Sequence, residues 1–157
     1  MGTAFTTSRN LVTSASVTSD TSTTLSGTNN ALPTGTPAHI RLIFDVTAFT
    51  DTAGAGAAAV DFLLEHSPDG GTTFYEHSRT ASITTSTGTR ELRFKNYHGP
   101  GDAAAEQTLA QISGPTADAN DGLIMKDHRI TASISGTGTT TLTYTVWGSV
   151  MEVHPWN

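Results

Sequence analysis

The segment from Val60 to Tyr75 constrains the fold more than any other, because extended runs flank a clear turn signal. Val60, Phe62 and Leu64 share one face of an extended chain, since successive side chains of a strand point to opposite sides. The interruption at residues 67–71 reads Ser-Pro-Asp-Gly-Gly. Proline presets φ at the second position of a turn, and the Asp-Gly pair tolerates positive φ. The segment therefore predicts a β-hairpin with one face in a core.

Further segments favour extended structure: Leu11–Val17, His39–Phe49, Arg90–Lys95, Arg129–Ser135 and Thr141–Val150, with a weaker strand around Thr23–Leu25. The glycines in Gly136-Thr137-Gly138 predict a turn, so the last two strands are expected to form a second hairpin. The segment Tyr97–Gly122 lacks this alternation, and a short helix is expected over Ala103–Ile112.

These elements predict an all-β fold, a β-sandwich or jelly-roll-like domain with extended terminal arms and one short helix. Residues 1–10 are expected to form an N-terminal arm, and residues 11–157 a single sandwich domain with a C-terminal tail over 151–157. The predicted core consists of Ile40, Leu42, Phe44, Val60, Phe62, Leu64, Leu92, Phe94, Ile130, Ile134, Leu142, Tyr144 and Val146.

Composition narrows the function classes. Charged residues make up 14% of the chain, against about 25% in a typical domain, and Thr, Ser, Ala and Gly fill the gap. The net charge is −6 with scattered Lys and Arg, which disfavours binding to a nucleic-acid backbone. Cysteine is absent, so disulfides and thiolate metal sites are excluded. The absence of cysteine fits a protein made in a reducing cytoplasm. We expect no signal peptide and no membrane segment.

No motif for catalysis is present. Gly-x-Ser-x-Gly does not occur, and Gly54-Ala55-Gly56 lacks the features of a phosphate-binding loop. His66 and His77 flank the hairpin turn and could face each other, but no third or fourth metal ligand is indicated. Asp118–Gly122 is interpreted as a polar turn rather than an ion site. The sequence therefore predicts a protein that is not an enzyme and has no cofactor or metal.

Several residues are candidates for contacts with other subunits or partners. Trp147 falls on the face of its strand opposite Tyr144, which points inward. The terminal segments hold apolar groups that they are too short to bury themselves. The predicted contact residues are Phe5, Arg9, Trp147, Met151, Val153 and Trp156.

Four segments together resemble a known class: Ile40–Ala48, Asp61–Phe74, Arg129–Gly138 and Thr141–Tyr144. In order and character the chain resembles small virion structural proteins of tailed bacteriophages, and within this class the capsid decoration, or cement, proteins. The resemblance implies a β-rich domain that assembles as a homo-oligomer, often a trimer. It implies binding to the major capsid protein on the outer head surface, after synthesis in the bacterial cytoplasm, with reinforcement of the shell. The segment Tyr97–Gly122 departs from the pattern.

Other classes remain open. The chain could be another head or tail component of a phage. A carbohydrate-binding module would need an exposed row of aromatic side chains, whereas most aromatics here fall on predicted core faces. An enzyme such as a small trimeric dUTP hydrolase has a similar length, but its motifs are absent.

Overall fold

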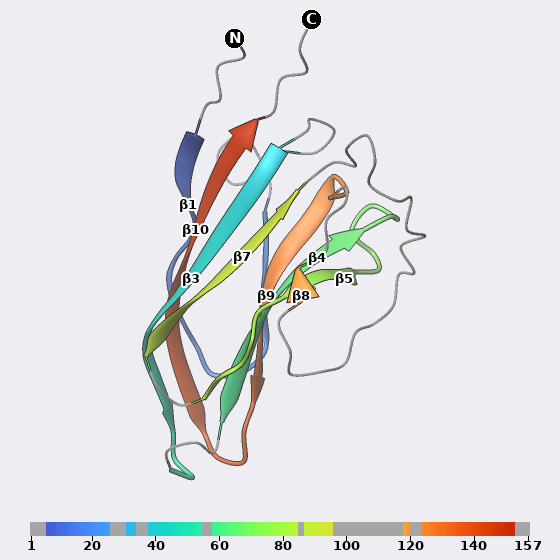
Figure 1. Cartoon of the computed structure of the whole chain (residues 1–157). Helices are drawn as coiled ribbons and strands as arrows, with labels where there is room; N and C mark the ends of the chain where they lie inside the picture. Colours follow the sequence, from blue (N-terminus) through green and yellow to red (C-terminus); the bar gives the residue numbers. More distant parts are fainter. Residues whose placement is uncertain are drawn as a thin grey trace, which may run out of the picture.

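The computed structural model describes residues 6–25, 31–33, 38–54, 58–84, 87–95, 118–119 and 124–152, and these residues contain strands and no helix (Figure 1). The four-stranded sheet has the order β1 (Thr6–Val17), β10 (Thr140–Glu152), β3 (Ala38–Asp51), β7 (Gly88–Lys95). The six-stranded sheet has the order β2 (Thr21–Thr24), β9 (Asp127–Ser135), β4 (Ala59–Ser67), β5 (Tyr75–Arg79), β8 (Asp118–Ala119), and β6 (Ile83–Thr84) also pairs with β4. Each pairing is antiparallel. The all-β sandwich prediction is confirmed.

The predicted strands all appear, most of them longer than the sequence pattern indicated. The weak strand near Thr23 is β2. The predicted N-terminal arm overlaps β1, because residues 6–10 pair in unbroken register with residues 151–147 of β10. The helix expected over 103–112 lies outside the described residues. The jelly-roll connectivity and the division into arm and domain stay predictions.

An aromatic contact joins the two sheets at the centre of the core. Phe62 of β4 stacks on Phe44 of β3 with ring centroids 4.8 Å apart. It also contacts Tyr144 of β10 in a tilted arrangement, with ring centroids 5.0 Å apart. The predicted core residues that are at most 2% exposed are Ile40, Leu42, Phe44, Val60, Phe62, Leu64, Leu92, Ile130, Leu142, Tyr144 and Val146. Ile134 is half-buried and packs against this cluster. The side chain of Phe94 lies outside the described residues.

The first predicted hairpin is confirmed as β4 and β5. Its turn takes positive φ at Gly70 (72°) and Gly71 (88°), one position later than the Asp-Gly pair suggested. Asp69 instead supplies hydrogen-bond acceptors: its Oδ1 accepts from the backbone N–H of Thr72 (3.1 Å) and Thr73 (2.7 Å) and from the Ser67 hydroxyl (2.7 Å). These bonds favour the ionised carboxylate and lower the pKa of Asp69 to about 2, with the Thr73 backbone bond the largest cause.

The second predicted hairpin is wrong. β9 belongs to the six-stranded sheet and β10 to the four-stranded sheet, so the turn at 136–138 crosses between layers. The turn packs against the end of β3: Thr52 N–H donates to the Thr139 carbonyl (3.1 Å), and Thr139 N–H donates to the Thr52 hydroxyl (2.8 Å). A Cβ on Gly138 would meet the backbone nitrogen of Ala53 at 2.7 Å. These glycines therefore allow a close crossing rather than a tight hairpin.

The Asp69 carboxyl should titrate with a pKa of about 2 in the folded protein, below its ordinary 3.8. Because the folded-state pKa is depressed, the stabilisation by the carboxylate is complete above pH 3.8 and is lost as pH falls from 3.8 through about 2. NMR titration measures this directly. Asp69→Asn should abolish the corresponding acid dependence of unfolding, whereas Asp45→Asn should retain it. A titration of Asp69 at the ordinary value would contradict the turn geometry.

Gly138→Ala should lower the free energy of unfolding by about 1–3 kcal/mol, because the added methyl group meets backbone that cannot move independently. The matched control is Gly88→Ala in β7, where the nearest atom to an added Cβ is 4.0 Å away and φ is not positive. Urea denaturation of both variants provides the comparison. Equal stability of the two variants would argue against a close crossing at 136–138.

Candidate interaction surface

The outward face of the four-stranded sheet brings together residues that are far apart in sequence. In one row across the sheet, Asn10, Trp147, Ile43 and Glu91 lie opposite one another in register on β1, β10, β3 and β7. The adjacent row holds Ser8, Ser149, Arg41 and Arg93. Because inward and outward positions alternate along each strand, the described side chains of these two rows share the solvent face. We call this face, over Asn10, Arg41, Ile43, Glu91, Arg93, Trp147 and Met151, the outer surface.

Apolar exposure concentrates on the outer surface. Trp147 is 43% exposed and Met151 is 38% exposed, and they are the exposed large hydrophobic side chains among the described residues. Both follow the outward parity of β10, separated by four residues, or about 13 Å along a strand. Ile43, half-buried, lies beside Trp147 in register. Trp is enriched among residues that dominate binding energies, so this grouping is typical of an interface.

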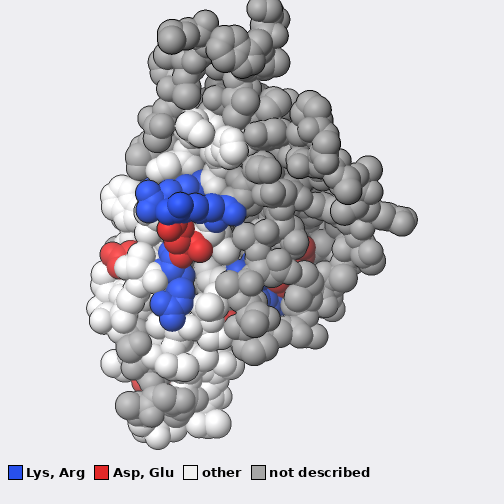
Figure 2. All heavy atoms as spheres, in the orientation of Figure 1, with Lys and Arg blue, Asp and Glu red and all other residues white. Residues whose placement is uncertain are grey.

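An ion-pair group borders these apolar side chains. Glu91 accepts from Nε of Arg41, and from Arg93 through Nε (2.7 Å) and a terminal nitrogen (3.1 Å). The hydrogen bonds from Arg93, followed by those from Arg41, lower the pKa of Glu91. Figure 2 shows basic side chains gathered around acidic ones on this face. All three residues are exposed, and exposed ion pairs contribute about 0–1 kcal/mol to stability.

The arrangement of the two arginines on the outer surface does not favour folding. Arg41 and Arg93 lie directly opposite each other on adjacent strands, where like charges destabilise a sheet. Glu91 compensates one of the two positive charges, which leaves the group with a charge of +1 on a chain whose net charge is −6. A surplus guanidinium beside an exposed Trp is suited to binding a carboxylate-bearing partner.

The predicted contact residues divide into three groups. Trp147 and Met151 share the outer surface, as expected. Arg9 pairs with Gly148 and therefore follows the opposite parity of β1. Phe5, Val153 and Trp156 lie outside the described residues. Since Thr6 pairs with Met151, the described chain begins and ends at the same end of the sheet (Figure 1).

Sequence reasoning missed the participation of Arg41, Glu91 and Arg93. Alternation along each strand is enough to place these three side chains opposite the core residues Leu42 and Leu92. Nothing local indicates that β3 and β7 are neighbours. The sequence contains the pattern Arg-x-Ile in β3 and the pattern Glu-x-Arg in β7. These patterns predict an ion-pair group only once the register of the two strands is known.

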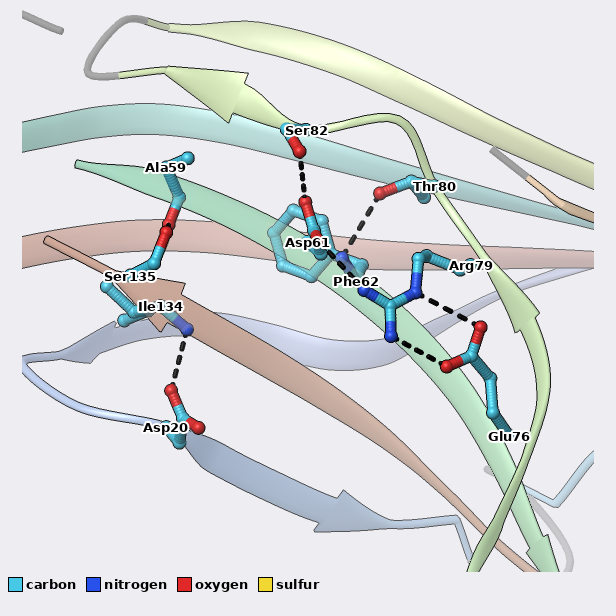
Figure 3. A network of polar contacts seen from close by, with 10 residues as sticks. All are labelled: Asp20, Ala59, Asp61, Phe62, Glu76, Arg79, Thr80, Ser82, Ile134 and Ser135. Carbon is cyan, nitrogen blue, oxygen red and sulfur yellow. Dashed lines mark hydrogen bonds and ion pairs between the residues drawn. The ribbon is translucent and has the colours of Figure 1, made fainter. Parts of the chain in front are cut away.

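The six-stranded sheet has a polar network with a different character (Figure 3). Arg79 donates to both carboxylate oxygens of Glu76 (3.1 and 2.8 Å) and to Asp61 (3.0 Å), which also accepts from Ser82 (2.5 Å). Glu76, the first cause, and Asp61 raise the pKa of Arg79. The side chains of Arg79 and Glu76 are only 15% and 4% exposed. These mutually paired groups fix the chain after β5 against β4, which is a structural role.

A second group of paired side chains lies on the six-stranded sheet. Arg129 binds Glu65 (2.7 and 3.3 Å), Thr131 donates to the same carboxylate, and the guanidinium lies 4.0 Å from the ring centroid of Phe74. His66 and His77 do face each other, with ring centroids 5.4 Å apart, but both are buried. In the described part of the chain, no group of three or more His, Asp or Glu side chains is placed to hold a metal ion. The prediction of a polar turn over Asp118–Gly122 is wrong for the two residues that are described, because Asp118 and Ala119 form the strand β8 and pair with β5.

The comparisons with protein-family models, curated proteins and solved structures found no match to this chain. None of the described segments forms a helix long and apolar enough to span a bilayer. The functional argument therefore rests on the residues themselves.

Arg79→Met should lower the free energy of unfolding by about 2–3 kcal/mol, because it leaves the nearly buried Glu76 without its partner. Arg93→Met removes the same side-chain type from the outer surface and should destabilise the protein much less, because exposed ion pairs are screened by solvent. Chemical denaturation at neutral pH measures both. If Arg93→Met were the more destabilising change, the ion pairs of Arg41, Glu91 and Arg93 would serve stability. They would then not support the interpretation of the outer surface as a binding site.

Proposed function

We propose that the protein is a virion structural protein of a tailed bacteriophage, a capsid decoration protein that binds the outer head surface as a homo-oligomer and stabilises the shell. The observation that supports this most is the outer surface, where Trp147 and Met151 are exposed next to the Arg41, Glu91 and Arg93 group. The resemblance of four segments to phage virion proteins supplies the class of partner, the major capsid protein.

The outer surface suits a contact repeated many times over one particle. Covering apolar area contributes about 25 cal/mol per Å², so Trp147 and Met151 provide a modest anchor for each copy. The surplus positive charge would steer the subunit towards an acidic patch on the shell. Linked subunits gain further, because each additional contact within one oligomer is effectively intramolecular. A weak surface in the monomer is therefore compatible with firm binding by a trimer.

The edges of the four-stranded sheet indicate how copies would associate. β7 forms one edge and includes Arg90, Glu91 and Arg93, charges that discourage strand addition. β1 forms the other edge, and its pairing with β10 is regular over residues 6–10 before register shifts begin after Asn10. Regular, largely uncharged edges accept an added strand. We propose residues 6–10 as the place where an extended segment of a neighbouring subunit pairs.

A carbohydrate-binding module is less well supported. Such a module stacks sugars on exposed aromatic side chains, and within the described ranges Trp147 has no exposed aromatic neighbour. Phe74 lies under Arg129 and Tyr144 is buried.

Binding to purified phage heads that lack the protein tests the proposal. Trp147→Ser should weaken head binding about ten-fold or more, since a central Trp commonly contributes that much to an interface. The matched variant Trp147→Phe, which keeps an apolar ring, should retain most of the binding. Native mass spectrometry should show an oligomer, and the decorated heads should rupture at a higher temperature than bare heads.

Two controls sharpen this experiment. Deletion of residues 1–5 tests the terminal arm without removing the paired residues 6–10. Arg79→Met, on the other sheet, controls for loss of stability. A protein that stays monomeric and ignores heads would overturn the proposed function. Equal binding by Trp147→Ser and the native chain would overturn the assignment of the outer surface.

A further inference from the structure

Three histidines meet at one end of the core. His66 of β4 and His128 of β9 lie directly opposite each other in register, and the ring of His77 from β5 meets the ring of His66 edge-on. All three side chains are buried. We call them the histidine cluster.

His128 joins three separate parts of the chain. Its Nε2 accepts a hydrogen bond from the backbone N–H of Leu32 (3.0 Å). Its Nδ1 faces the carbonyl oxygens of Lys126 (3.0 Å) and Met125 (3.1 Å). Its own carbonyl accepts from Leu25 N–H (3.0 Å). An accepting Nε2 and a donating Nδ1 require the neutral ring with its proton on Nδ1. This bonding pattern therefore exists only while His128 is uncharged.

The surroundings give a proton little compensation. Desolvation is the largest cause lowering the pKa of His128 and of His66, and His128 lowers that of His66 further. The carbonyls of Met125 and Lys126, and then Asp127, act in the opposite direction on His128. The buried Nδ1 of His66 makes no hydrogen bond.

The other charged groups on the strands that pack here do not stabilise a protonated histidine, because they are either paired with other residues or positively charged. Glu65 of β4 is bound by Arg129 and Thr131. Glu76 of β5 is bound by Arg79. Lys126, next to the carbonyl that His128 contacts, is a cation. The apolar side chains of Leu25, Leu32 and Ile124 are buried around this end of the core. A charged histidine ring there would therefore be poorly solvated.

We propose that the histidine cluster is an acid-sensitive closure, in which neutral His128 holds residues 31–33 against the end of the sandwich and its protonation releases them. A proton on Nε2 would set two donors, the ring N–H and Leu32 N–H, against each other. The charge would also lie beside His66. Release would expose Leu32 while the aromatic contact of Phe44, Phe62 and Tyr144 stays intact. This inference does not depend on the proposed function.

The pH window follows from the direction of the shifts. The pKa of His66 and of His128 is lower in the closed state than the ordinary 6.5. The open state therefore binds protons first, so closure is fully stable above pH 6.5 and weakens as pH falls below 6.5 towards the depressed values.

Hydrogen exchange of the native protein, followed by NMR and corrected for the intrinsic pH dependence, tests this closure. Protection of the Leu32 amide should fall about ten-fold or more between about pH 7.5 and about pH 5. The amides of Phe44 and Val146 in the paired centre of the four-stranded sheet should keep their protection. Ring nitrogen shifts should show His128 protonated on Nδ1 at neutral pH. Constant protection at Leu32, or a loss shared equally by the whole core, would overturn the proposal.

A substitution separates titration from structure. In His128→Gln, the side-chain carbonyl can accept from Leu32 N–H but cannot titrate, so protection of Leu32 should become independent of pH. The matched control His39→Gln, on β3, should keep the native pH dependence. An unchanged pH dependence in folded His128→Gln would overturn the role of His128. If that variant does not fold, the native exchange profile and tautomer decide the proposal alone.

Discussion

Phe62 packed against Phe44 and Tyr144 is the contact on which the rest of the structure depends, because it joins the two sheets. Truncating such a buried Phe typically costs about 3–5 kcal/mol. The contact also fixes which residues point outward. Once Phe44 and Tyr144 are inside, the period of two along β3 and β10 leaves Arg41, Ile43 and Trp147 no position but the solvent face.

The outer surface is therefore a consequence of the core, yet its composition is not what stability alone would favour. An exposed Trp and two opposed guanidinium groups contribute little to folding in water. Elsewhere on the same sheet the chain has threonines, which are neutral and β-branched and suit an outer face. This contrast supports binding to a partner as the function, with a capsid surface as the proposed partner.

Buried polar groups lie in two different kinds of environment. Around Arg79, charges meet partners of opposite sign with short hydrogen bonds, and the network holds chain segments together at neutral pH. In the histidine cluster, desolvation lowers the pKa of His66 and of His128, and the His66 Nδ1 lacks a partner. The first arrangement is held together by pairs of opposite charge. The second depends on the protonation state of one ring, since the same nitrogen of His128 that accepts from Leu32 is the one that would be protonated.

The sequence by itself determined the longer strands, their buried faces and the position of the first turn, because the alternation of side chains and the φ preferences of Pro and Gly are local properties. It did not indicate the two-residue strands β6 and β8. It also determined that Tyr144 points inward and Trp147 outward. Apart from the hairpin of β4 and β5, only the tertiary structure decided which strands pair. Arg41 and Glu91 are 50 positions apart, and Leu32 and His128 are 96 apart; no local pattern indicates such contacts. The misassigned second hairpin has the same cause: a short glycine turn permits either pairing or a crossing between layers, and the packing of 136–139 against the end of β3 selects the crossing.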